Sequence, residues 1–367
     1  MNALTELLNE PVTNRINQRD LPEDNITDGN DRSAMAQLGI LAAVPAMKRR
    51  SFLIGTMGLA TAASIGQLLH AEEVIDPDKM TASEYLKRFP ESMTLPDGGK
   101  VVVEKFDVDN RHSFTPEPAK QCLLVLRYLH PEPGNTDKEL QRQIDTSRRE
   151  LGQVIAHLQG KWGVKHFSLE GYTKEEFVLR KLWGKKGLSS AERGLLDQAI
   201  AELRKRDDIK FMSPEEECRG IDYELQMNTP EGMYDLIRKN TIALFPGETE
   251  QVHRASINEI TAHPNNMSLK IVRADREDMC IEFASKIKAV VIGTIWGNSH
   301  HGPHPSGKYG RSPSQVFRWN LTNRGHQFNT AVLSTPISVW KDKTTGTGRC
   351  ADYSSFKKSS LMISPIE

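Results

Sequence analysis

The sequence lacks an excess of charge of either sign, because 48 Lys and Arg residues balance 48 Asp and Glu residues in a chain of 367. A nucleic-acid-binding surface needs a marked basic excess, so this balance argues against DNA or RNA as a partner. Aromatic residues are also few, at 7%, and hydrophobic residues make up 38%. This apolar content is low for a globular chain, but it is sufficient for a core.

The signature motifs of several common enzyme classes are also missing. The sequence contains no G-x-S-x-G, H-E-x-x-H, P-loop or G-x-G-x-x-G motif, which excludes the usual serine-hydrolase, zincin and nucleotide-binding signatures. No C-x-x-C spacing occurs among the four cysteines, which are Cys122, Cys218, Cys280 and Cys350. An oxidising compartment would permit up to two disulfides, and buried free thiols at Cys122 and Cys280 are an equal alternative to a bridge between them.

A targeting segment is present between Met47 and Ala71. Two adjacent arginines precede the uncharged run Ile54–Leu69, which is short and diluted by glycines. This pattern is typical of a twin-arginine signal peptide, and a retained membrane anchor or a core helix are the alternatives. We expect cleavage after Ala71 or Ala62, a periplasmic or secreted protein, and contact with the membrane and the export machinery only during transport.

The segment ahead of Met47 is polar and acidic, which does not suit a position before a basic signal-peptide region. We therefore expect residues 1–46 to be an untranslated or disordered leader, with translation beginning at Met47 or Met35. Residues 72–116 are predicted to form a peripheral lead-in, and residues 341–367 a loose tail. Residues 117–340 remain as the predicted folded domain.

That domain alternates between strand and helix patterns. Residues 122–129 form an apolar run of strand length, residues 136–160 have helical spacing, and residues 164–169 form a second strand. This order predicts an α/β fold with a mostly parallel central sheet and flanking helices. Capping boxes at Thr173 and Ser189 begin further helices, so we expect a helical insertion over about 173–270. Residues 273–285 are predicted to be helical, residues 289–292 a third strand, and residues 315–333 a hairpin.

Polar residues follow the three predicted strands. His130 follows the first strand and Glu170 ends the second. The loop after the third strand holds Asn298, His300, His301 and His304. Because the carboxyl ends of parallel strands meet at one edge, we expect His130, Glu170 and His300 to share a site. They could bind a divalent metal or act as general acid and base, or each could be a solvated surface group.

Other polar residues are weaker candidates for the site, because they do not directly follow a predicted strand. Arg276 could orient a substrate carboxylate, as could Asn298 in a neighbouring loop, or Arg276 could pair with a glutamate of its own helix. Three histidines lack a strand-end position, and we interpret them as structural: His253, His263 and His326. His166 lies inside a predicted strand, where alternation would leave it either packed or exposed.

Four segments together resemble the TIKI/TraB superfamily, which includes erythromycin-esterase-like and ChaN-like haem-binding proteins. They are Leu126–Pro131, Phe167–Gly171, Arg273–Phe283 and Ala289–His300. The resemblance implies an active-site histidine at His300, within Gly297-Asn298-Ser299-His300, and places the family's glutamate at Glu170 and its first-strand histidine at His130.

These observations predict an exported protein that acts as a metal-dependent hydrolase on a small molecule or peptide, with His130, Glu170 and His300 in its site. A non-catalytic protein that binds haem or a metal is the first alternative. An envelope protein without an active site is the second.

Overall fold

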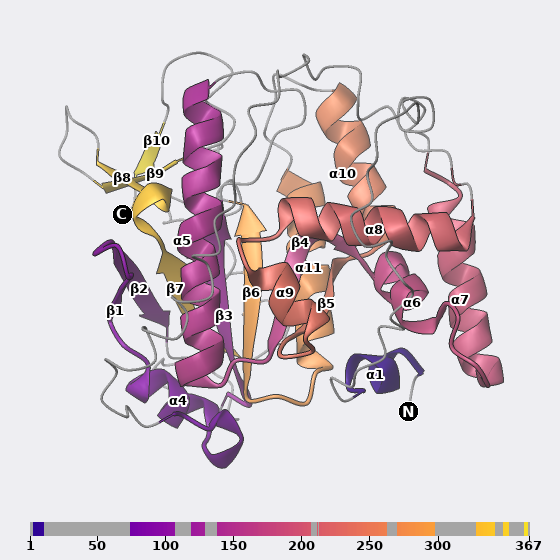
Figure 1. Cartoon of the computed structure of the whole chain (residues 1–367), viewed down its shortest axis with the longest axis horizontal. Helices are drawn as coiled ribbons and strands as arrows, with labels where there is room; N and C mark the ends of the chain where they lie inside the picture. Colours follow the sequence, from indigo (N-terminus) through magenta and orange to yellow (C-terminus); the bar gives the residue numbers. More distant parts are fainter. Residues whose placement is uncertain are drawn as a thin grey trace, which may run out of the picture.

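The computed structural model of the chain describes residues 3–10, 74–106, 119–128, 138–206, 211, 213–262, 270–297, 328–341, 348–351 and 363–365. These residues form an α/β fold around one seven-stranded sheet with the order β1-β2-β7-β3-β6-β4-β5 (Figure 1). Its strands are β1 (Ser92–Thr94), β2 (Lys100–Phe106), β3 (Gln121–Tyr128), β4 (His166–Thr173), β5 (Ala243–Glu248), β6 (Val291–Gly297) and β7 (Phe328–Ser334).

The centre of the sheet is parallel, as predicted. β3 pairs in parallel with β6 and β7, and β4 pairs in parallel with β6 and β5. The two antiparallel pairs are β1 with β2 and β2 with β7. A parallel sheet needs cover on both faces, so the middle of its central strands is mostly apolar. The continuous run Cys122–Leu126 in β3 is accordingly fully buried.

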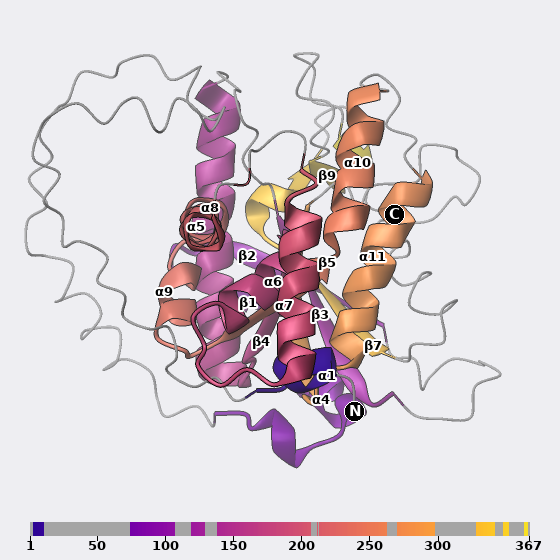
Figure 2. The same ribbon diagram turned by 90° about the vertical axis from the view of Figure 1, so that its right-hand side faces the viewer.

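Helices supply that cover on both faces. They are α1 (Ala3–Leu8), α4 (Ala82–Arg88), α5 (Lys138–Trp162), α6 (Lys174–Leu182), α7 (Ser190–Leu203), α8 (Pro214–Asn228), α9 (Met233–Arg238), α10 (Glu250–Ala262) and α11 (Lys270–Ser285), with short 3-10 turns η2 (Pro77–Lys79) and η4 (Pro336–Ser338). Figure 2 shows α5 and α9 on one side of the sheet and α10 and α11 on the other.

The predicted capping boxes are present. Thr173 accepts a hydrogen bond from the Glu176 backbone N–H and its own N–H donates to the Glu176 side chain, which begins α6. Ser189 and Glu192 do the same for α7. Each cap satisfies two backbone donors that have no partner inside the helix.

The predicted helical insertion over about 173–270 also contains a strand. β5 lies within it and forms one edge of the main sheet. Pro246 and Gly247 argue against a strand in the sequence, since proline cannot donate to a β-ladder. An edge strand tolerates proline because it needs donors on one side only, and Pro246 pairs in register with Leu169 of β4.

The ends of the predicted domain also differ from expectation. β1 and β2 belong to the main sheet, so residues 92–106 are more than a peripheral lead-in. Residues 3–8, within the expected untranslated or disordered leader, form α1, because Leu4, Leu7 and Leu8 bury their side chains. The expected loose tail contains β9 (Gly348–Ala351) and β10 (Ile363–Pro365), which form a second sheet with β8 (Val339–Lys341).

Several predictions fall outside the described residues. The signal peptide at 47–71 and the first half of the expected hairpin lie there, whereas its second half is β7, parallel to β3. Cys280 is a buried free thiol, and Cys122 is buried as well. None of the helices in the described part of the chain is long and apolar enough to cross a membrane.

Candidate functional site

Two glutamates from neighbouring strands meet at the carboxyl edge of the sheet. Glu170 lies near the end of β4, and Glu248 is the last residue of β5. Arg276 of α11 joins them, since its Nη2 lies 3.0 Å from Glu170 Oε1 and its Nε lies 2.5 Å from Glu248 Oε2. Glu248 has no exposed surface, so this is a buried ion pair at a strand end.

Backbone N–H groups also donate hydrogen bonds to both carboxylates. Gly171 N–H donates to Glu248 Oε1 at 2.8 Å, and Gly297 N–H donates to Glu170 Oε2 at 2.6 Å. The register between β4 and β5 shifts after Leu169, and Gly171 has a φ of 85°. Glycine adopts this left-handed conformation at little cost, which lets the bulge turn its N–H toward Glu248.

His253 of α10 is the fourth side chain of this group. Its Nδ1 lies 3.2 Å from Glu248 Oε1, and about a quarter of its side chain, 27%, is exposed. The Thr249 hydroxyl accepts a hydrogen bond from Val252 N–H, so α10 begins directly after β5. The first turn of α10 therefore returns His253 to the end of the strand that precedes it. We call Glu170, Glu248, His253 and Arg276 the strand-end cluster.

Charge within this cluster shifts the pKa of Glu248 and of His253. Burial alone would raise the pKa of Glu248, but the charge of Arg276 and the hydrogen bonds from His253 and Arg276 lower it to about 2. Burial would lower the pKa of His253, but the hydrogen bond to Glu248 and its charge outweigh burial and raise it above the usual 6.5. Glu248 is therefore ionised at neutral pH, and the pKa of His253 lies above that of a free imidazole.

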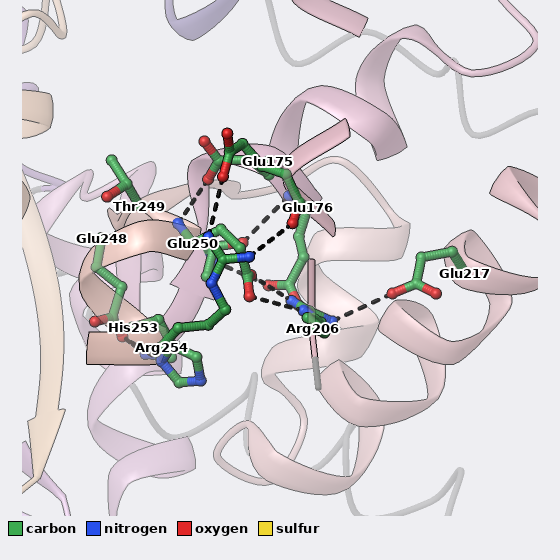
Figure 3. Close-up of polar contacts among 12 residues, drawn as sticks. Glu175, Glu176, Arg206, Glu217, Glu248, Thr249, Glu250, His253 and Arg254 are labelled. Carbon is green, nitrogen blue, oxygen red and sulfur yellow. Dashed lines mark hydrogen bonds and ion pairs between the residues drawn. The ribbon is translucent and has the colours of Figure 1, made fainter. Parts of the chain in front are cut away.

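A second group of acidic and basic side chains adjoins the first (Figure 3). Arg206 lies 2.7 Å from Glu250, 3.2 Å from Glu217 and 2.5 Å from Glu176. The Glu250 N–H at the start of α10 donates to Glu175 Oε2 at 2.7 Å. These contacts tie α6, α8 and α10 together, so they fix the position of the helix that carries His253.

The structure brings together two of the predicted site residues, Glu170 and Arg276. Arg276 pairs with Glu170 and Glu248, not with Glu277 or Glu282 of its own helix, and Glu282 pairs instead with Lys286. The other predicted site residues lie outside the described part of the chain: His130, Asn298, His300, His301 and His304.

Two members of the cluster were not predicted from the sequence. Glu248 was missed because β5 was expected to be part of a helical segment, and His253 because it then lacked a strand end. A signal for both was present in Ala243–Glu248, a short apolar run that ends in a carboxylate, with Thr249 as a helix cap immediately after it.

The described residues do not form a metal-binding group of three or more His, Cys, Asp or Glu side chains. Both oxygens of Glu170 are already engaged, Oε1 by Arg276 and Oε2 by Gly297 N–H. A guanidinium next to this carboxylate opposes a second cation. The predicted metal centre and the haem alternative depend on residues outside the described part, and both stay predictions.

Comparison of the whole chain with protein-family models, curated proteins and solved structures finds no match. The resemblance to the TIKI/TraB superfamily therefore rests on the four quoted segments alone.

Proposed function

We propose that the protein is a hydrolase in which His253 is the general acid and base and Glu248 orients it. One observation carries this proposal: a partly exposed imidazole is held through Nδ1 by a fully buried carboxylate. Its Nε2 has no partner among the described residues, so it is available for a substrate or water.

The charge of Glu248 determines which nitrogen carries the proton. An ionised carboxylate can only accept hydrogen bonds, so Nδ1 of His253 must donate. In the neutral imidazole Nε2 then has a lone pair, which can take a proton from water as that water attacks a carbonyl carbon. The same Nε2–H can later protonate the leaving group.

Arg276 supports this arrangement indirectly. Its two hydrogen bonds to Glu248 keep that carboxylate ionised and fixed in orientation. Without Arg276 the buried Glu248 would take up a proton at higher pH and could no longer accept from Nδ1. Arg276 is therefore a positioning residue in this proposal.

A second carboxyl group near the site titrates close to neutrality. Burial, followed by the charge of Glu176, raises the pKa of Glu224 on α8 to about 7, and the charge of His253 opposes this rise. Carboxyl groups whose environments separate their pKa values are a common feature of acid–base sites. The pKa of about 2 for Glu248 and the pKa of about 7 for Glu224 follow that pattern.

The substrate class that suits this chemistry is an ester or amide of a small molecule or peptide. Export through the twin-arginine route and action outside the cytoplasm remain part of the proposal, supported by the signal-peptide pattern at 47–71.

The test is hydrolysis of p-nitrophenyl esters and peptide amides by the full chain and by His253→Gln. We expect kcat to fall about 100-fold to 10,000-fold in this variant, the usual contribution of a general base. His166→Gln is the matched control, because His166 is the first residue of β4 and therefore lies at the amino ends of the parallel strands, away from the strand-end cluster. Equal rates for wild type and His253→Gln would overturn the proposal.

A metal-dependent reaction would behave differently. Metal analysis of the protein and of His300→Ala, together with assays in chelator, separates the two mechanisms. Activity that survives the chelator and is lost in His253→Gln supports the acid–base proposal over the metal-dependent prediction.

A further inference from the structure

Arg127 is a buried cation outside the strand-end cluster. It lies one residue before the end of β3 and is 3% exposed. Its Nη1 donates to Ser334 Oγ at 3.2 Å at the end of β7. Its Nε and Nη2 are buried without a hydrogen-bond partner within the part of the chain that the structure describes.

The two unpartnered atoms lie on the same edge of the guanidinium. Nε–H and Nη2–H point in nearly the same direction and form a fork that matches two oxygens of one carboxylate or phosphate. Arg276 uses this fork in the same protein, with Nε and Nη2 on the two oxygens of Glu248. Arg127 presents the same donors without a protein carboxylate.

The charge of Arg127 is also uncompensated at short range. Among the described residues no carboxylate lies within 4 Å of it, and Glu104 of β2 acts on it only through space. Burial lowers the pKa of Arg127 to about 10, so the guanidinium is still charged at neutral pH. A buried charge without a partner costs free energy, which an incoming anion would recover.

The position of Arg127 connects it to the same edge of the sheet. In the parallel ladder it lies opposite Trp296 of β6. The ring of Trp296 in turn lies 5.6 Å from the Arg276 guanidinium carbon. Ligands of open parallel sheets bind at this edge, beyond the carboxyl ends of the strands.

We propose that Arg127 binds an oxyanion, a carboxylate or phosphate of a small ligand, through Nε–H and Nη2–H. This site does not depend on the proposed hydrolase activity, since binding alone reveals it.

The test is the thermal unfolding of the full chain in sodium acetate and in sodium phosphate, against sodium chloride at equal ionic strength. An anion that binds only the folded state raises Tm, by about 5 °C when its concentration is about 100 times Kd. We expect such a rise with at least one oxyanion. A rise in acetate alone identifies a carboxylate site, and a rise in phosphate alone identifies a phosphate site.

Two variants assign the response to Arg127. Arg127→Met should abolish the rise in Tm, and Arg127→Lys, which keeps the charge but lacks the fork, should reduce it. Arg193→Met on the exposed face of α7 is the control and should retain the full rise. No rise in the wild type, or the same rise in Arg127→Met, would overturn the proposal. If Arg127→Met does not fold, an unchanged rise in Arg127→Lys overturns it.

Discussion

Arg276 holds Glu248 through two parallel hydrogen bonds, from Nε to Oε2 at 2.5 Å and from Nη2 to Oε1 at 2.8 Å. The pair joins α11 to the end of β5 at the edge of the sheet where Glu170 and His253 also lie. Since Glu248 has no exposed surface, its charge depends on these partners. The stability of this edge and the proposed chemistry therefore rely on the same contacts.

Removing the charge of Glu248 should destabilise the protein markedly. Glu248→Gln leaves Arg276 with an incomplete set of partners, and breaking a buried ion pair costs about 3 to 5 kcal/mol. Glu282→Gln is the control, because its pair with Lys286 is partly exposed and should change stability by less than about 1 kcal/mol. Urea denaturation measures both, and equal costs for the two variants would count against a buried pair.

A methyl group at Gly247 should disturb the same edge. A Cβ there would lie 2.6 Å from the Leu169 carbonyl oxygen, so β4 and β5 would have to separate next to Glu248. We expect Gly247→Ala to lower the free energy of unfolding by about 1 to 3 kcal/mol and to lower the rate of hydrolysis. At Gly194 on α7 an added Cβ would meet no atom within 4 Å, so Gly194→Ala should instead raise the free energy of unfolding by up to about 1 kcal/mol. Denaturation of the two alanine variants gives the comparison, and a stable, fully active Gly247→Ala would refute this geometry.

The free energy of unfolding should fall on both sides of a window between about pH 4.5 and 6.5. The folded pKa of Glu248 is depressed to about 2, so its contribution is present above about pH 4.5 and is lost as the pH falls toward 2. The folded pKa of His253 is raised, so its contribution is complete below about pH 6.5 and is lost as the pH rises through the folded value.

Variants separate these two limbs of the pH profile. Relative to wild type, Glu248→Gln should lose the acid limb, and His253→Gln should lose the alkaline limb. Denaturation series from pH 3 to 9 show both, and an acid limb that persists in Glu248→Gln would mean that other carboxylates cause it.

The N-terminal helix should contribute to stability. Leu7 of α1 is 3% exposed, and the Asn9 side chain bonds to Lys286 O at 2.8 Å and to Lys288 N–H at 2.6 Å. Leu7→Ala should therefore cost about 2 kcal/mol or more, whereas Glu6→Ala on the exposed side of α1 should cost little. Chemical denaturation of the full chain checks this, and identical midpoints would show that α1 is not docked.

The same helix gives a direct check on export. Cleavage after Ala71 would remove residues 1–71 and with them α1, so intact-mass measurement of protein recovered from outside the cytoplasm distinguishes the two forms. Recovery of a chain that begins near Glu72 supports export. A chain that retains residues 3–10 argues against the predicted signal cleavage.

Local patterns in the sequence predicted much of the fold. The apolar run of β3, the helical spacing of α5 and the capping boxes of α6 and α7 each depend on neighbouring residues, and the structure confirms them. β5 was not recognised in this way although its apolar run is a local signal, because Pro246 is acceptable only at a sheet edge and strand order is a long-range property.

Part of the site was also predictable from local sequence. Glu170 follows from its place at a strand end, and the structure places it at the carboxyl edge of the sheet. The partnership of Glu248 with His253 required knowledge of β5, and that of Arg276 with Glu170 required the packing of α11 against the sheet. Sequence spacing does not carry the second relationship, because Glu170 and Arg276 lie far apart in the chain.

The pKa of the His253 imidazole, measured by NMR titration of the full chain, tests the acid–base assignment most directly. The account predicts a value above 6.5 in the wild type, with the proton on Nδ1 in the neutral form, and a lower value in Glu248→Gln. A wild-type value at or below 6.5 that Glu248→Gln leaves unchanged would contradict it.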